Sequence, residues 1–362
     1  MVMIEERTSV GLDVHAHAIV GAAVDTGTGE LFSKRLGPDS HGVVAWLRSL
    51  PGPVVVAYEA GPTGYTLARA LADAGISCVV AAPSKIRRAP GDRVKTDRRD
   101  AELLARLLLA GDITAVTVPT VNQEAARDLV RAREDARVDL MKVRHRVSKL
   151  LLRYDQRYEG TTWTRSHLRW LRQQKFNQPA LQFAFDSNLE ALLAGIDRRD
   201  VLDRAISSMA ADCEYTPVTN RLACLRGIST LTAFALAVEI GDWSRFGGRT
   251  IASYLGLVPS EYSTGNSRSQ GGITRTGNLH ARRLLIQAAW NHKRPYWPSS
   301  PVMKARWDLV TREVRDRGHA GNRRLHQRWQ VYRAKGKRNT VANTAVAREL
   351  AGWCWSLAVM TG

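Results

Sequence analysis

Residues 9–25, SVGLDVHAHAIVGAAVD, decide the fold of the amino-terminal part of the chain. Apolar side chains alternate there with small or polar ones, which is the pattern of β-structure with one buried face. The next four residues, TGTG at 26–29, supply a turn before the strand-like sequence LFSKRL. The stretch therefore predicts a β-hairpin.

The segments that follow alternate between helix and strand patterns. Short apolar runs predict strands, and amphipathic runs that end near glycine predict helices. In chain order these are helix 41–49, strand 54–58, helix 65–74, strand 76–82, a helix from about Thr96 to Gly111, and a short strand at 115–118. An antiparallel hairpin followed by a β-α-β unit predicts an α/β domain with a mixed sheet covered by helices.

The rest of the chain is predicted to be mainly helical. Residues 122–158 contain neither glycine nor proline, and apolar residues recur there at helical spacing among dense charges. This predicts a long charged helix, either an arm of a coiled coil or a helix that lies solvated on its own domain. A second helical stretch covers 188–213, and a unit of helices and glycine-marked breaks begins near Pro217. We therefore expect three regions, 1–120, 121–215 and 216–362.

The charge of the chain is informative about its partners. The 362 residues include 53 Lys and Arg against 34 Asp and Glu, a net charge of +19. Such an excess favours a polyanionic partner, because each phosphate neutralised by Lys or Arg releases condensed counterions. A basic protein without a nucleic-acid role is the alternative. The sequence from His292 onward is rich in Arg, Lys, Trp and Tyr, which suits phosphate contact and base stacking, or equally a helical cap with packed tryptophans.

Several classes of protein are disfavoured by composition. No apolar run approaches the roughly 18–20 residues needed to cross a bilayer, and the first eight residues are too short and polar for a secretory signal. The four cysteines lie far apart, without a CxxC pair that would indicate zinc. We expect a cytoplasmic protein with reduced thiols and no membrane contact.

Four carboxylates stand where they can form one site. Asp13 lies inside the first strand-like run, where an ionised carboxylate is costly unless a cation or hydrogen bonds compensate it. Glu59 ends the run VVVAYE, at the carboxyl edge where open α/β sheets bind ligands. Asp97 and Asp100 open a predicted helix with i, i+3 spacing and so share a face. Taken singly, Asp97 has an ordinary explanation as a helix cap and Glu59 as an ion-pair partner.

Taken together, these carboxylates predict a divalent-metal site. Mg²⁺ and Mn²⁺ are hard ions that prefer carboxylate and water oxygens. Two such ions about 3.5–4 Å apart can activate one oxygen of a phosphodiester and stabilise the leaving one. We therefore predict Mg²⁺ (or Mn²⁺) bound by Asp13, Glu59, Asp97 and Asp100.

The sequence resembles the DEDD transposases of insertion sequences, the IS-one-ten family, whose amino-terminal domain is RuvC-like, that is, RNase H-like. The matching motifs are GLDVH around Asp13, YEAGPTGY around Glu59 and KTDRRDAELLARLL around Asp97 and Asp100. The resemblance continues in LRGISTLTA, RFGGRTIASYLGLVPSEYSTG and GGITRTGNLHARRLLIQAAW, and covers most of the chain except its middle and last stretch. It implies a RuvC-like domain, a helical or coiled-coil segment, and a mainly helical transposase domain.

The segment GLVPSEYSTGNSRSQGGITRTGN is dense in Gly, Ser and Thr and predicts a loop, with a polar surface turn as its ordinary explanation. The resemblance implies that a serine of this segment attacks DNA. Ser263 is the best match, and Thr264 and Ser260 are the alternatives. A serine hydroxyl needs a base, a metal or positive charge to attack phosphorus, and the predicted metal site could serve if the two domains meet. Attack would leave a phosphoserine–DNA linkage.

Four arginines near this segment are candidate ligands for phosphate, because the guanidinium fork matches phosphate oxygens. They are Arg268, Arg275, Arg282 and Arg283. For Arg282 and Arg283, which precede the apolar run LLIQAA, a solvent-facing helix start is the alternative.

The leading hypothesis is a transposase or recombinase that cuts and rejoins DNA with a metal and Ser263. The resemblance further implies that a structured non-coding RNA of the element selects the DNA, and that copies of the chain assemble as a dimer or tetramer. One alternative is a RuvC-like nuclease of the junction-resolvase type, in which water attacks and Ser263→Ala keeps cleavage. Another is a DNA- or RNA-binding protein without catalysis.

Overall fold

The computed structural model describes residues 7–86, 96–264, 267–298 and 300–361, except for the side chain of Arg268. These residues form two compact units, 1–120 and 121–362, and the helical segment after residue 120 belongs to the second. Among the described residues, no helix is long and apolar enough to cross a membrane.

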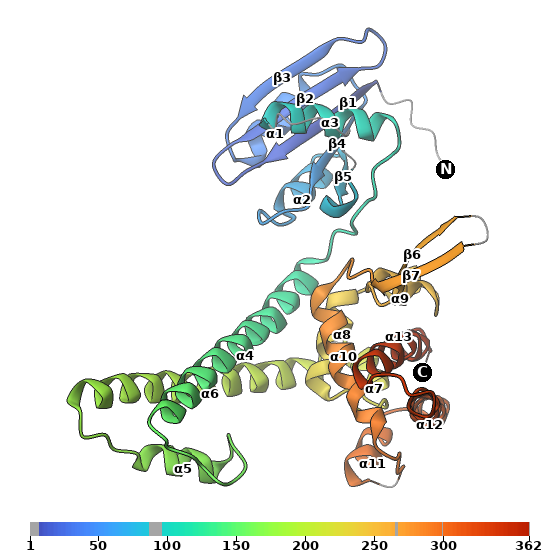
Figure 1. The fold of residues 1–362 in the computed structure, drawn as a ribbon. Coiled ribbons are helices and arrows are strands. Elements are labelled where there is room, and N and C mark those ends of the chain that lie inside the picture. The colour runs from blue at the N-terminus through green and yellow to red at the C-terminus, as the bar shows by residue number, and fades with distance from the viewer. Residues whose placement is uncertain (1–6, 87–95, 265–266, 299, 362) are drawn as a thin grey trace. The chain divides into compact units, whose positions relative to one another are not determined.

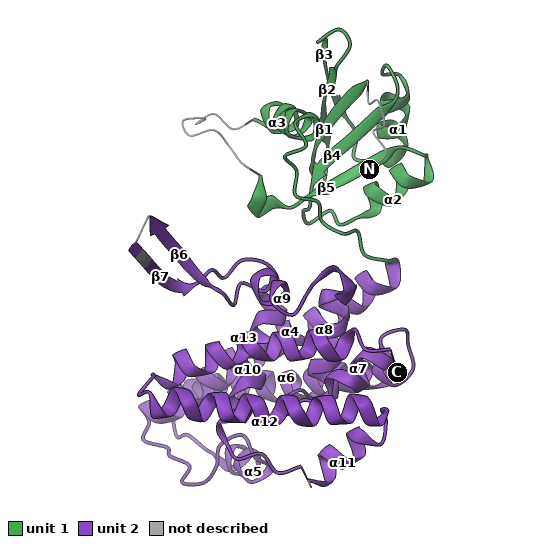
Figure 2. Cartoon of the chain, turned by 90° about the vertical axis from the view of Figure 1, so that its right-hand side faces the viewer, with its two compact units in different colours: residues 1–120 green, residues 121–362 purple. Residues whose placement is uncertain are grey.

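The first unit is a mixed sheet with helices on both faces (Figure 2). The strands lie in the order β3-β2-β1-β4-β5. β1 pairs antiparallel with β2 and parallel with β4. The elements are β1 Thr8–Val14, β2 Ile19–Asp25, β3 Leu31–Leu36, α1 Ser40–Arg48, β4 Val54–Glu59, α2 Thr66–Asp73, β5 Ser77–Ala81, a 3₁₀ turn at Pro83–Lys85, and α3 Asp97–Leu109. The predicted α/β mixed-sheet class is confirmed.

The alternation within residues 9–25 explains how the sheet is covered. Val10 and Leu12 of β1 are fully buried in a core with α1 and α2. Gly11 faces the other side, where it lies against α3. The predicted hairpin is in fact two strands, β1 and β2, inside these residues, with β3 added after the TGTG turn.

The strand predicted at 115–118 was wrong. Among the described residues, this segment makes one isolated bridge, between Ala115 and Ala81. The amide of Val116 donates to the carbonyl of Val80, but Pro119 follows closely and has no amide to extend the ladder.

The second unit is mainly helical (Figure 1). Its elements are α4 Val121–Arg153, α5 Arg165–Gln173, α6 Pro179–Ala211, α7 Thr216–Leu222, α8 Thr230–Ile240, a 3₁₀ turn at Trp243–Arg245, α9 Thr250–Tyr254, β6 Pro259–Thr264, β7 Ser267–Ile273, α10 Leu279–Ala289, a 3₁₀ turn at Trp290–Lys293, α11 Pro301–Trp307, α12 Arg312–Ala334 and α13 Asn339–Ala358.

The long charged helix predicted after residue 121 forms as α4 and packs along α6 (Figure 1). Its apolar stripe, including Leu140, Val143 and Val147, is buried in a cluster with Leu171 of α5 and Leu192 of α6. These residues are spaced by three and four positions, as in coiled-coil packing. Their burial shows that the stripe is not solvated.

The loop predicted around Ser263 was wrong as a secondary-structure assignment. Its first part forms the antiparallel strands β6 and β7, in which Ser263 faces Arg268. A glycine-rich connection then leads to α10. Gly277 in this connection has φ 70°, and a Cβ there would lie within van der Waals overlap of the Tyr254 carbonyl oxygen, so glycine is required.

Candidate active site

The end of β1 and the start of α3 lie together because small residues let the helix pack closely on the strand. The hydroxyl of Ser9 donates a hydrogen bond to the carbonyl of Ala105 (2.8 Å). Two residues further along β1, a Cβ on Gly11 would lie 2.0 Å from the carbonyl oxygen of Ala101. Continuing this antiparallel course brings the first turn of α3 to Asp13. The Thr96 hydroxyl caps that turn by accepting from the amide of Arg99.

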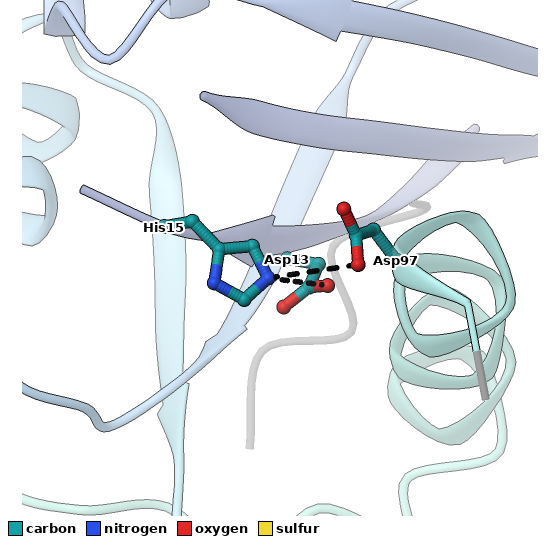
Figure 3. A group of neighbouring side chains, drawn as sticks. All are labelled: Asp13, His15 and Asp97. Carbon is teal, nitrogen blue, oxygen red and sulfur yellow. Dashed lines mark hydrogen bonds and ion pairs between the residues drawn. The ribbon is translucent and has the colours of Figure 1, made fainter. Parts of the chain in front are cut away.

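Three side chains form a tight group at this junction (Figure 3). Potential ligand atoms of Asp13, His15 and Asp97 all lie within 4.8 Å of one another. Nε2 of His15 is 3.1 Å from Asp13 Oδ2 and 3.8 Å from Asp97 Oδ1. The Asp13 side chain is 19% exposed, whereas His15 and Asp97 are more than half exposed. The group is therefore rooted in the sheet and open to solvent on its outer side.

The electrostatics of Asp13 favour a bound cation. Burial raises the pKa of Asp13, and the nearby carboxylates of Asp100 and Asp97 raise it further, while His15 opposes the rise. Burial penalises the ionised form because it removes water from the carboxylate, and the neighbouring carboxylates penalise it by charge repulsion. A divalent ion would supply compensating positive charge, and the carboxylate oxygens with one imidazole nitrogen suit such an ion.

The two other predicted ligands lie near this group without being part of it. In the parallel pairing of β1 with β4, Leu12 lies beside Tyr58, so Asp13 and Glu59 are the next residues on the two strands. Glu59 is exposed at that edge, and Asp100 is close enough to influence the pKa of Asp13. The structure thus gathers Asp13 and Asp97 with His15, which sequence reasoning missed. Its place two residues after Asp13, in step with the strand alternation, was the available signal.

Ser263 occupies a second chemically suggestive position, on the exposed hairpin of β6 and β7. Its hydroxyl donates a hydrogen bond to Oε1 of Glu261 (2.8 Å). Gln270 faces Glu261 across the hairpin, and its side-chain nitrogen Nε2 donates to Oε2 of the same carboxylate (3.2 Å). A hydroxyl, a base and a group that orients the base are therefore in contact, which is the arrangement used to activate nucleophiles.

The two alternative hydroxyls are placed differently. The Ser260 hydroxyl donates to the carbonyl of Gly272 across the hairpin (3.2 Å). Thr264 is exposed, and its hydroxyl has no hydrogen-bond partner among the described residues. Among the described contacts of these three hydroxyls, that of Ser263 is the one made with a carboxylate.

Comparisons with known proteins address both halves of the chain. A family model described as a DEDD transposase of the IS110 type matches residues 10–155, and a model for transposases of the IS116/IS110/IS902 family matches residues 219–306. A putative transposase of Sinorhizobium fredii, y4qE, is 42% identical over 308 residues, which are 84% of this chain and 75% of the relative. The chain belongs to the IS110 family of transposases.

Further relatives agree with this membership. The transposase of insertion sequence element IS1533 from Leptospira borgpetersenii is 29% identical over 92% of this chain and 99% of its own length. A probable family 20 transposase of Pseudomonas aeruginosa is 30% identical over 67% of this chain and 72% of its own length. As a member of this family, the chain is an enzyme that cleaves and joins DNA, and DEDD transposases use divalent metal ions.

The predicted phosphate-binding arginines of the transposase occupy different surroundings. Arg275 is exposed, with a left-handed backbone (φ 57°) that is unusual for a residue with a side chain. Arg282 is buried and donates to the carbonyls of Leu255 and Thr276, so it holds the chain around α10 together. Arg283 forms an ion pair with Glu134 (2.5 Å). The side chain of Arg268 lies outside the described residues.

The transposase also contains a buried ionic network that the sequence did not reveal. Glu239 of α8 is fully buried, and it binds Arg131 of α4 through both oxygens, at 2.9 Å each. Asn278 and His280 donate to the same carboxylate from the start of α10. Burial alone would raise the pKa of Glu239, but the hydrogen bonds from His280, Arg131 and Asn278 and the charge of Arg131 lower it to about 2. The network ties α4, α8 and α10 together.

Proposed function

We propose that this transposase cuts DNA by attack of Ser263 on a backbone phosphodiester, which leaves a phosphoserine–DNA linkage for rejoining. The observation that carries the proposal is the hydrogen bond from the Ser263 hydroxyl to Glu261. A serine hydroxyl is a weak nucleophile at neutral pH, and an adjacent base removes this obstacle.

In the proposed step, Glu261 accepts the proton of Ser263 as Oγ bonds to phosphorus. One P–O ester bond to deoxyribose breaks, and the leaving oxygen becomes a hydroxyl by taking up that proton or one from solvent. Gln270 keeps the carboxylate of Glu261 turned toward the serine. The linkage conserves the energy of the broken ester, so that a hydroxyl of another strand can later displace the serine.

The metal site of this reaction is proposed to consist of Asp13, Glu59, Asp97 and Asp100, with His15 as an added ligand. A divalent ion bound there would polarise the phosphodiester and stabilise charge on the leaving oxygen. His15 bears on which ion is used, because Mn²⁺ accepts an imidazole nitrogen more readily than Mg²⁺, which prefers oxygen and retains its waters. We therefore propose that the enzyme works with Mn²⁺, or with either Mn²⁺ or Mg²⁺, and does not depend strictly on Mg²⁺.

We also propose that a structured RNA encoded by the element pairs with the DNA and selects it, and that copies of the chain assemble as a dimer or tetramer around both. The net charge of +19 is compatible with binding to both nucleic acids, because counterion release favours contact with either phosphate backbone. Base pairing would then read sequence, while the protein contacts backbone and shape.

A recombination assay tests the proposal. Purified protein is incubated with the DNA ends of the element, its flanking RNA, and Mg²⁺ or Mn²⁺, and the products are denatured and probed for DNA linked to protein. We expect an adduct with the wild type and none with Ser263→Ala or Asp13→Ala. Thr264→Ala and Ser260→Ala are matched controls that remove neighbouring hydroxyls, and both should keep the adduct.

The outcomes separate the candidate functions. If the adduct persists in Ser263→Ala and is lost in Thr264→Ala or Ser260→Ala, Ser263 is not the nucleophile. Cleavage that survives in Ser263→Ala but fails in Asp13→Ala would show that water attacks, as in a junction resolvase. Binding to DNA without cleavage in any condition would favour a protein that has lost catalysis.

A further inference from the structure

A hollow lined by arginines lies among α9, α12 and α13 of the second unit. Its volume is about 580 Å³, which is larger than a single phosphate needs. The guanidinium groups that line it come from different elements: Arg249 precedes α9, Arg317 and Arg328 belong to α12, and Arg348 belongs to α13. Side chains from separate helices thus place their positive charge around one space.

The single carboxylate in the lining is already neutralised. Glu349 accepts from Arg324 through Oε1 (3.0 Å) and from Arg328 through Oε2 (3.1 Å). Arg249 and Arg348 are exposed, and neither guanidinium group has a hydrogen-bond or ion-pair partner among the residues that the structure describes. The hollow therefore carries an excess of positive charge, which favours a ligand with negative charge.

Two aromatic rings of the hollow, those of Trp353 and Tyr332, are contacted by arginines of α12. The guanidinium of Arg317 lies 4.3 Å from the centre of the Trp353 ring, and its Nε donates to the Ser356 hydroxyl (2.9 Å). The same ring packs so closely on α12 that a Cβ on Gly321 would lie 2.9 Å from it. Since Trp353 is contacted in this way, it positions an arginine and does not offer a free platform for a base.

We propose that this hollow binds the phosphate backbone of DNA, with Arg249 and Arg348 as its principal ligands and Arg317 in support. Free guanidinium groups match phosphate oxygens, and the family acts on DNA. The rings of Trp353 and Tyr332 are contacted by arginines, whereas no described residue pairs with the side chains of Arg249 and Arg348. The contact is therefore with the backbone and independent of base sequence. It would give the second unit a contact with DNA made by residues other than Ser263.

The test measures DNA binding by fluorescence anisotropy over a series of salt concentrations, with the full chain and a duplex of the element end. Each phosphate contact contributes about 0.9 to the slope of log affinity against log salt. We expect Arg249→Gln and Arg348→Gln each to reduce the magnitude of that slope by about 1, and the double variant to reduce it by about 2. A scrambled duplex should show the same loss.

A matched control is Lys34→Gln with Arg35→Gln, which removes the same charge from exposed positions on β3. This control should leave the slope near that of the wild type. Circular dichroism and the melting temperature establish that each variant is folded, as expected for exposed side chains without described partners.

Three outcomes overturn the proposal. In the first, the slope is unchanged in the double variant. In the second, the slope falls equally in the control, which would mean that only the total charge matters. In the third, the loss appears with RNA of the same sequence and not with DNA, which would assign the hollow to RNA.

Discussion

Gly11 lies where α3 approaches β1 most closely beside the proposed metal site, so a substitution there tests that proposal. In Gly11→Ala, the new Cβ would lie 2.0 Å from the carbonyl oxygen of Ala101 and 2.6 Å from the amide nitrogen of Ala105. Contacts shorter than 3.0 Å are essentially never seen for real Cβ atoms, so α3 must retreat by roughly 1 Å. Such a shift is larger than the displacement of about 0.5 Å that the side chains of a binding site tolerate before binding is impaired.

The retreat of α3 carries Asp97 away from Asp13. Short metal–oxygen bonds cannot follow a shift of this size, so we expect affinity for Mn²⁺ to fall about 10–100-fold. Overpacking should also lower the free energy of unfolding by about 1–3 kcal/mol. Electron paramagnetic resonance of free Mn²⁺ during a titration measures the first effect, and urea unfolding measures the second.

Gly21→Ala provides the matched control for this prediction. A Cβ on Gly21 would lie 2.3 Å from the Trp46 ring, on the face of the sheet that α1 covers. This variant should lose stability to a similar degree and keep its affinity for Mn²⁺. If Gly11→Ala binds Mn²⁺ as tightly as Gly21→Ala, the close approach of α3 to β1 does not position the metal ligands, and the reasoning is refuted.

Three further predictions concern single side chains. The folded pKa of Glu239 is about 2 against an ordinary value of 4.5, so its stabilising contribution is complete above about pH 4.5 and is lost as pH falls toward 2. Urea midpoints of the wild type should fall over that window, and those of Glu239→Gln should depend less on pH; equal slopes would contradict the network. Glu261→Gln should slow adduct formation by roughly 10²-fold or more, measured by quenched-flow, while DNA affinity is unchanged, because a general base contributes about this much. His15→Ala should weaken Mn²⁺ binding about tenfold and remove the ¹⁴N modulation of bound Mn²⁺ in pulsed resonance spectra, whereas His17→Ala should do neither; modulation that persists in His15→Ala would exclude this ligand.

The strand and helix order of the first unit was predictable because its information is local. The alternation in SVGLDVHAHAIVGAAVD and the apolar run VVVAYE reflect which face of each strand is buried, and that preference is written residue by residue. The placement of Asp13 within a strand and of Asp97 at the start of a helix followed from the same patterns. The prediction of a strand at 115–118 was wrong because this segment pairs with the sheet through one isolated bridge among the described residues.

The hairpin that carries Ser263 was not predictable in this way. Its glycine and serine content is typical of loops, and its strands are exposed, so no buried face imposes an apolar alternation. Pairing across the hairpin is what brings Gln270 to Glu261, and the contact of Glu261 with Ser263 depends on that arrangement.

What the sequence alone determined was the set of local patterns and motifs: the mixed sheet, the long charged helix, the acidic residues and their order, and the excess of positive charge. Only the tertiary structure decided which side chains meet. It placed His15 against Asp13, gave Glu239 its partners from α4 and α10, buried Arg282, and left Arg348 exposed in the lining of a hollow. The physical reason is that these contacts join residues far apart in the chain or depend on side-chain direction. For the buried Glu239 and Arg282, their strength also depends on packing that excludes water.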